Sequence, residues 1–229
     1  MISNPIKGYR NEKYPAGDVT QWFGENPELY MVVCKMKSHN GIDIVAPWYT
    51  PLYAVESGTV CEVKTDPSGY GMHLRFLTGD KTSKEVQREW TYGHLANIDV
   101  KVGDKIVVGQ KIANMGNTGF VVSDINASGF WVKGSNKYSG THLHLTCREF
   151  KYSKKGWSYY PNTPKIEILN YNNGWNGAMD FVNMFPLNSW EGDVEIKKRE
   201  LEALPKIDLN NEDNWNMFLK ILKWLRFNS

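Results

Sequence analysis

The stretch PLYAVESGTVCEV (residues 51–63) decides the fold class, because it places short runs rich in β-branched and aromatic residues around a Ser-Gly turn. Dipeptides such as Gly79-Asp80 supply the backbone angles that tight turns require. The same alternation of runs and turns returns in GYGMHLRFL (69–77), REWTYGHL (88–95) and KIVVGQKIANMG (105–116). We therefore expect residues 45–150 to form an antiparallel all-β domain, with compact, barrel-like sheets and no helix.

Beyond these strands, 229 residues suit one main domain and an appendage. We place the main domain at 1–185 and the appendage at 186–229, which starts as a charged linker. Residues 215–227 then show the period of an amphipathic helix, with a basic stripe opposite a broad apolar face. We expect this helix to contact a partner protein or a second copy of the chain. Docking on its own β domain and binding to an anionic membrane are the alternatives.

Charge does not identify a partner, since 27 Lys and Arg against 25 Asp and Glu give a net charge of +2. This balance creates no field that would demand nucleic acid, and no nucleic-acid partner is expected. No stretch approaches the roughly 18 consecutive apolar residues of a spanning helix. The first residues, MISNPIKGYRNEKYPAGD, have no apolar run after a basic start, so we expect no signal peptide.

The three cysteines, Cys34, Cys61 and Cys147, are too few and too far apart for a disulfide framework. None belongs to a CxxC pair, which excludes a cysteine zinc site. Cys34 and Cys61 are predicted to be small buried hydrophobic residues in strands. Cys147 follows a pair of histidines but is predicted to lie too far along its strand to join them.

Histidines carry the chemical signal of this sequence. Four of the five fall in three short motifs: His39-Asn-Gly-Ile-Asp43, Tyr92-Gly-His94-Leu95 and Gly140-Thr-His142-Leu-His144. In a strand, residues two or four apart share a face, so His39 can align with Asp43, and His142 with His144. Catalytic zinc takes about three protein ligands, usually His and a carboxylate, and leaves one position open. Two of these histidines and Asp43 meet that need, and the others become supporting or catalytic groups.

Two further residues, Gly41 and His73, can be interpreted from the sequence around these motifs. Gly41, midway between His39 and Asp43, lets the backbone pass close to a metal or a substrate without a side chain in the way. His73 stands outside the motifs and is interpreted as a hydrogen-bonded structural residue.

These motifs together resemble those of the M23 peptidases, the lysostaphin-like and LytM-like endopeptidases that cut peptidoglycan peptides. The resemblance covers roughly residues 18 to 150. It rests on TQWFGENP, HNGIDI, TPLYA, GTV, GYG, YGHL, VGD, GQKIA, GNTG and HLH. The departures are a long insertion between Gly119 and Gly140, and Leu145 in place of an aromatic residue that often follows the last ligand.

Carried over to this chain, the resemblance implies that His39, Asp43 and His144 bind one Zn²⁺ per chain. It implies that His94 and His142 are catalytic, that a β-sheet groove holds the substrate, and that the substrate is bacterial peptidoglycan. The two catalytic histidines would take a proton from water and pass one to the leaving amine, with their roles undivided. A tyrosine shortly before the first ligand assists some relatives, and the role of Tyr30, nine residues upstream of His39, stays open.

Other readings remain beside this one. A catalytically inactive or occluded M23-like module would bind the cell wall or activate another hydrolase. A biotinyl or lipoyl carrier domain would explain the VKVGDKIVVGQKIANM pattern but has no lysine turn of the required kind.

The insertion and the biological setting complete the expectations. Residues 120–139 are predicted to form a flap beside the groove, with Phe130, Trp131 and Tyr138 able to contact substrate; a surface hairpin that packs its own aromatic residues is the alternative. Without a signal peptide, we expect the protein to reach the cell wall as a phage endolysin or virion-associated enzyme. Export of a bacterial enzyme by another route is the alternative.

Overall fold

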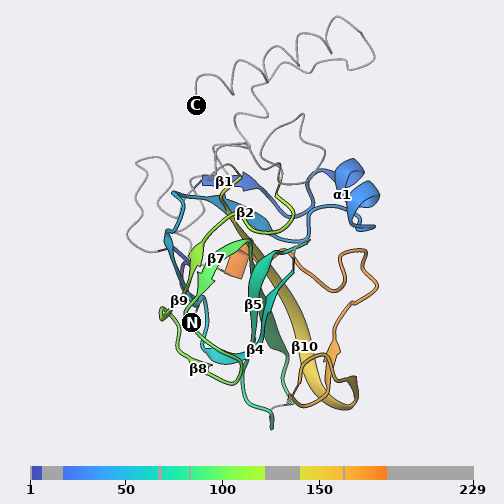
Figure 1. Cartoon of the computed structure of the whole chain (residues 1–229). Helices are drawn as coiled ribbons and strands as arrows, with labels where there is room; N and C mark the ends of the chain where they lie inside the picture. The colour runs from blue at the N-terminus through green and yellow to red at the C-terminus, as the bar shows by residue number, and fades with distance from the viewer. Residues whose placement is uncertain are drawn as a thin grey trace, which may run out of the picture. The chain divides into compact units, whose positions relative to one another are not determined.

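The alternation of buried and polar residues produces strands almost everywhere in this computed structural model. The structure describes residues 2–6, 18–66, 69–82, 84–121, 140–161 and 163–184, without the side chains of Asp18 and Val33. Every strand pairing in these ranges is antiparallel, which confirms the predicted all-β class. Figure 1 shows the arrangement of the elements.

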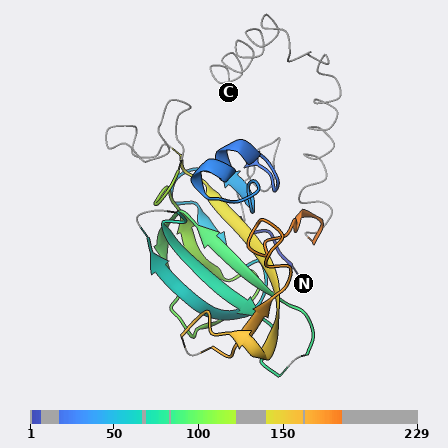
Figure 2. The same cartoon turned by 90° about the vertical axis from the view of Figure 1, so that its right-hand side faces the viewer.

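The larger sheet has the strand order β1-β2-β10-β6-β5-β4-β8, and β11 pairs with β10 outside this path. The long strand β10, yellow in Figures 1 and 2, pairs with β2, β6 and β11. The strands of this sheet are β1 (Asp18–Gln21), β2 (Ile42–Val45), β4 (Gly58–Thr65), β5 (Met72–Thr78), β6 (Gln87–Gly93), β8 (Lys105–Ile106), β10 (Leu143–Trp157) and β11 (Ile166–Ile168).

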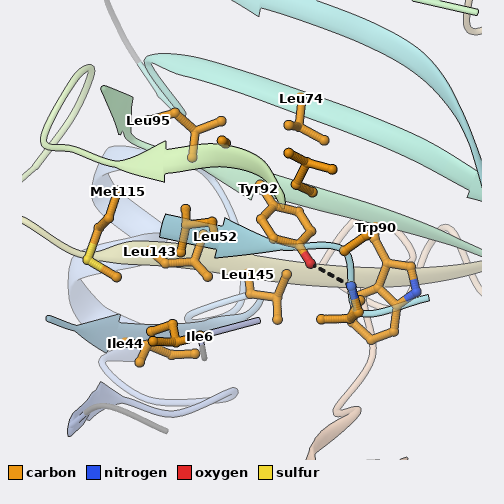
Figure 3. Packing of buried hydrophobic residues seen from close by; sticks show 14 of the residues in the cluster. Ile6, Ile44, Leu52, Leu74, Trp90, Tyr92, Leu95, Met115, Leu143 and Leu145 are labelled. Carbon is orange, nitrogen blue, oxygen red and sulfur yellow. Dashed lines mark hydrogen bonds between the residues drawn. The ribbon is translucent and has the colours of Figure 1, made fainter. Parts of the chain in front are cut away.

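The smaller sheet supplies the other side of the core. It consists of β3 (Pro51–Tyr53), β9 (Lys111–Met115) and β7 (Leu95–Ile98), in the order β3-β9-β7. Its buried Leu52 and Ile112 belong to the same hydrophobic cluster as residues of the larger sheet. Figure 3 shows this packing, and its dashed line marks the bond that the Tyr92 hydroxyl accepts from the Val55 backbone N–H at 3.0 Å.

Strand alternation assigns opposite roles to the two faces of β10. Leu143, Leu145 and Cys147 are fully buried in the core cluster. His144, Thr146 and Arg148 therefore project from the other face, because successive side chains in a strand point in opposite directions. The same holds on β2, where Ile42 and Ile44 enter the core and Asp43 does not. The two face assignments bring Asp43 and His144 onto one polar surface.

Helix α1 (Pro27–Val33) was not expected from the sequence. Its signals were present: Pro27 at the first turn fixes a helical φ, and Glu28 lies where the helix dipole favours an acid. The helix also corrects the prediction for Cys34, which is exposed at the C-cap and not buried in a strand. Cys61 is buried in β4 as expected.

Several expectations concern parts of the chain outside the described residues. They include the flap at 120–139 beyond Val121, with Phe130, Trp131 and Tyr138, and the linker and helix of 186–229. Within the residues that are described, no helix has the length and apolar character needed to cross a membrane.

Candidate metal centre and catalytic histidines

Three donor atoms from β2, β10 and the loop before β2 converge on the polar surface. His144 Nδ1 lies 2.8 Å from Asp43 Oδ1, His39 Nε2 lies 3.2 Å from the same oxygen, and the two ring nitrogens are 3.0 Å apart. All three residues are buried. Register explains the meeting, since His144 and Asp43 are direct partners across β10 and β2.

The hydrogen bonds on the far side of each ring turn its inner nitrogen toward the cluster. His39 Nδ1 lies 3.0 Å from the Trp22 carbonyl oxygen, which can only accept, so a neutral His39 has its lone pair on Nε2. His144 Nε2 lies 2.7 Å from Thr146 Oγ1, which leaves Nδ1 for the cluster. Such outer partners orient metal-binding histidines. Two imidazole nitrogens and a carboxylate oxygen that face one another within hydrogen-bond distance offer three donor atoms to one shared cation.

The donor set fits zinc. Two imidazole nitrogens and one carboxylate oxygen are the ligands of many catalytic zinc sites. Ligands bonded to one tetrahedral ion at about 2.0–2.1 Å lie about 3.3–3.4 Å from one another, close to the spacing found here. Among the described residues, His39, Asp43 and His144 are also a group of metal-binding side chains whose donor atoms all lie within 4.8 Å.

Gly41 makes this convergence possible. A Cβ atom at this position would lie 2.3 Å from the Leu145 carbonyl oxygen and 3.0 Å from His144 Nε2. Any other residue would push the loop that carries His39 away from β10. The expected close approach of the backbone is therefore present, and its neighbour is strand β10.

Electrostatics keep the carboxylate ionised. Burial alone would raise the pKa of Asp43, but attraction to His142 and hydrogen bonds from His144 and His39 outweigh it and lower this pKa well below its ordinary value. Burial lowers the pKa of His144 in spite of the hydrogen bond to Asp43. An anionic oxygen beside a neutral imidazole is the state that metal ligands need.

His94 and His142 lie beside this cluster with their rings 4.5 Å apart. Each is held through Nδ1 by a backbone carbonyl oxygen, His94 by that of Thr118 at 2.8 Å and His142 by that of Gly140 at 2.7 Å. His142 Nε2 lies 3.7 Å from Asp43 Oδ1. Because a carbonyl accepts, Nδ1 donates in both rings and a neutral ring keeps its basic lone pair on Nε2.

The backbone at His94 is strained in a way that suits a functional position. Its φ of 60° lies in the left-handed region, and its N–H donates to the Tyr70 carbonyl at 2.8 Å. Such conformations persist where the surroundings impose them, often at functional sites. Burial, together with the nearby His142 and His144, lowers the pKa of His94 well below its ordinary value. His94 is therefore neutral in the structure as it stands, with its lone pair on Nε2.

Two tyrosines next to the cluster were not assigned a role from the sequence. The Tyr70 ring packs 5.2 Å from the His144 ring, and its hydroxyl accepts a bond from Asn40 Nδ2 at 2.9 Å. The Tyr30 ring lies 5.2 Å from that of His39, and its hydroxyl donates to Gln21 Oε1 at 3.1 Å. The GYG motif belonged to the family resemblance, but only the fold reveals that the Tyr70 ring lies against His144 on β10.

The remaining histidine and cysteine signals lie away from the cluster. His73 is buried, with Nδ1 3.0 Å from the Gly71 carbonyl oxygen and Nε2 3.3 Å from Glu62 Oε2. Cys147 faces the hydrophobic core, where burial raises its pKa well above the ordinary value. Neither residue contributes to the converging donor set.

Comparison with known proteins agrees with this geometry, since the profile of Peptidase family M23 matches residues 37–157, more than half of the chain. The chain belongs to peptidase family M23. The matched range contains the three donors and both neighbouring histidines. Membership confirms the family that the sequence motifs indicated.

Individual relatives of this M23 chain share only part of their length with it. Glycyl-glycine endopeptidase ALE-1 of Staphylococcus capitis is 34% identical over 119 residues, which are 52% of this chain and 27% of the relative. Peptidoglycan DD-endopeptidase ShyA of Vibrio cholerae is 33% identical over 93 residues, 41% of this chain and 20% of the relative. A catalytic-domain structure of the prophage-encoded M23 protein EnpA from Enterococcus faecalis has a TM-score of 0.42 at 28% identity and covers 63% of this chain and 88% of that one. The chain thus spans about a quarter or less of the length of these two curated relatives.

Proposed function

We propose that this M23 chain is a zinc-dependent endopeptidase that hydrolyses peptide bonds in bacterial peptidoglycan, with His39, Asp43 and His144 holding one zinc ion. The observation that carries the proposal is the convergence of two imidazole nitrogens and one carboxylate oxygen within 3.2 Å of one another. The substrate class is inferred from relatives that are a glycyl-glycine endopeptidase and a peptidoglycan DD-endopeptidase.

A bound zinc ion would supply Lewis acidity that polarises a carbonyl oxygen and makes water more acidic. Side chains of the protein would transfer the protons and stabilise the developing negative charge. His94 and His142 present Nε2 as a proton acceptor, because their Nδ1 atoms are held by Thr118 and Gly140. One of them can take the proton of the attacking water and return it to the leaving amine, while the other donates a hydrogen bond to the oxygen on which negative charge develops.

The inactive or occluded M23-like module is the rival function. It is disfavoured because the three donors and the two anchored histidines occupy one surface with their outer hydrogen bonds in place. A module that only binds the wall has no need of this arrangement. The carrier-domain alternative leaves all of these contacts unexplained. The phage setting, with action at the cell wall as an endolysin, stays a prediction.

One experiment separates these possibilities. The purified protein is analysed for zinc by elemental analysis and then incubated with purified peptidoglycan, whose products are identified by mass spectrometry. We expect about one zinc per chain and new amino termini in the wall peptides. Stoichiometric zinc without any new amino terminus would favour the binding or activating module.

A further inference from the structure

A cavity of about 440 Å³ lies at the hairpin formed by β10 and β11. Backbone pairing builds its frame, since Tyr152 pairs with Ile166 and the Ser153 N–H donates to the Lys165 carbonyl at 3.1 Å. The turn between β5 and β6 adds a third wall. The residues that line the cavity are Lys81, Tyr152, Ser153, Lys154, Pro164 and Lys165.

This cavity, called here the lysine pocket, is separate from the metal centre. His144 and Tyr152 lie on the same strand, eight positions apart in the numbering. At about 3.3 Å per residue that spacing corresponds to about 26 Å. A molecule in the lysine pocket would therefore leave the metal centre accessible.

Three ammonium groups give the pocket its charge. Lys81, Lys154 and Lys165 come from three separate segments, and all three residues are exposed. The lining itself contains no acidic residue. The acid next to it in sequence, Asp80, accepts the backbone N–H and the hydroxyl of Thr82 at 2.8 and 3.0 Å, and these bonds, with the charges of Lys105 and Lys81, lower its pKa and keep it ionised. The pocket thus keeps an excess of positive charge.

Hydroxyl groups and apolar walls add to the charge. Burial raises the pKa of Tyr152, so its hydroxyl stays protonated and can donate. Ser153 brings a second hydroxyl, and Pro164 with the Tyr152 ring gives an uncharged wall. An occupant should accordingly combine an anionic group with a less polar part.

We propose that the lysine pocket binds a phosphodiester group of an anionic polymer, with the adjoining polyol or sugar unit against Pro164 and Tyr152. Lysine binds phosphate as a point charge, and three of them around one cavity suit a group with several acceptor oxygens. The volume lies in the range of about 300–1,000 Å³ found for small-molecule sites, well above the needs of one inorganic anion. That the polymer belongs to the bacterial wall rests on the proposed function, whereas the anion site itself does not.

The test compares two variants of the full chain that lose the same charge. The pocket variant carries Lys81→Gln, Lys154→Gln and Lys165→Gln, and the control variant carries Lys35→Gln, Lys64→Gln and Lys101→Gln, all at exposed positions. Binding of a glycerol-phosphate oligomer is measured by calorimetry at low salt. We expect the pocket variant to bind about ten-fold more weakly and the control to stay within about two-fold.

Two other outcomes would overturn the proposal that the lysine pocket binds an anionic polymer. Equal weakening of both variants would show diffuse attraction to surface charge and overturn the proposal. Pocket-dependent binding of phosphatidylglycerol vesicles without binding of the oligomer would identify a membrane surface and reject the polymer. Binding of the oligomer is measured without hydrolysis, so it tests the pocket independently of the proposed enzyme activity. A protein that cuts no peptidoglycan can still bind the oligomer in the pocket, and an active enzyme can still fail to bind it.

Discussion

Two polar clusters share the polar face of β10, one against β2 and the other against β6, and they are built on opposite principles. At one end of β10, His144 meets Asp43 and His39. Four positions further along, Arg148 Nε and Nη2 each donate to a carboxylate oxygen of the fully buried Glu89 at 2.8 Å. Tyr160 also donates its hydroxyl to Glu89. The first cluster gathers three atoms that can bind a metal ion, whereas the second pairs each carboxylate oxygen with a donor.

This difference separates a binding site from a structural anchor. A buried carboxylate costs free energy unless it is paired and hydrogen-bonded, and Glu89 is both. In the histidine cluster the outer nitrogens are bonded to Trp22 and Thr146, which leaves two inner nitrogens and one carboxylate oxygen facing one another. A metal ion can bind all three atoms at once. The comparison predicts that the two clusters respond differently to mutation.

The largest effect is expected at the metal centre. His144→Ala and Asp43→Ala each remove one of three donors, so the zinc content should fall from about one per chain to near zero. Peptidoglycan hydrolysis should disappear with it. Elemental analysis of the purified variants measures the metal, and release of new amino termini measures activity.

His73→Ala is the matched control for these variants. It removes a buried histidine that bonds Gly71 and Glu62 and lies outside the donor set. Its folded fraction should keep a full complement of zinc. If the Asp43 and His144 variants retained as much zinc as the His73 variant, the metal centre and the mechanism built on it would be wrong.

The next effect concerns His94 and His142, which border the cluster without belonging to its donor set. His94→Ala and His142→Ala should keep zinc but lose about 10²–10⁴-fold in turnover, the usual contribution of a positioned acid or base. Metal content and turnover are measured on the same samples. Turnover of His94→Ala at the rate of the unmodified protein would make His94 a structural residue.

Mutation of the structural anchor formed by Glu89, Arg148 and Tyr160 should lower the free energy of unfolding. Glu89→Ala leaves the largely buried Arg148 without its carboxylate partner, and breaking a buried pair in this way costs up to about 3–5 kcal/mol. Denaturant unfolding measures the loss, with Glu167→Ala at an exposed position expected to stay within about 0.5 kcal/mol. Zinc per folded chain should not change. A Glu89 variant of full stability that lost its metal would show that the two clusters are one functional unit.

The comparison also shows what the sequence could and could not predict. Alternation along the strands sufficed for the all-β class, because strand geometry is local. The spacing of the motifs indicated a metal site with Asp43 and two histidines, and only the resemblance to M23 peptidases singled out His39 and His144. The Glu89 anchor was invisible, since Glu89, Arg148 and Tyr160 are far apart in the chain and belong to no motif. Cys34 was misplaced because seven residues of helix give too short a period to distinguish from a strand. Long-range pairing, and not local pattern, decides such cases.

The smallest effect is expected at Tyr70, which joins the donor cluster to the turn before β5. Tyr70→Phe keeps the ring against His144 and removes the bond from Asn40, which lies next to His39 in the chain. A net hydrogen bond contributes about 1 kcal/mol, so zinc affinity, measured by competition with a chelator, should fall about five-fold. Tyr70 is partly exposed, so water can replace its hydroxyl and keep the loss small. Tyr171→Phe, at an exposed tyrosine, controls for loss of a hydroxyl as such.

Tyr70→Ala also removes the ring that packs on His144 and should weaken zinc binding further. Equal zinc affinity of Tyr70→Ala and the unmodified protein would mean that β2 and β10 position the donors without help from this turn.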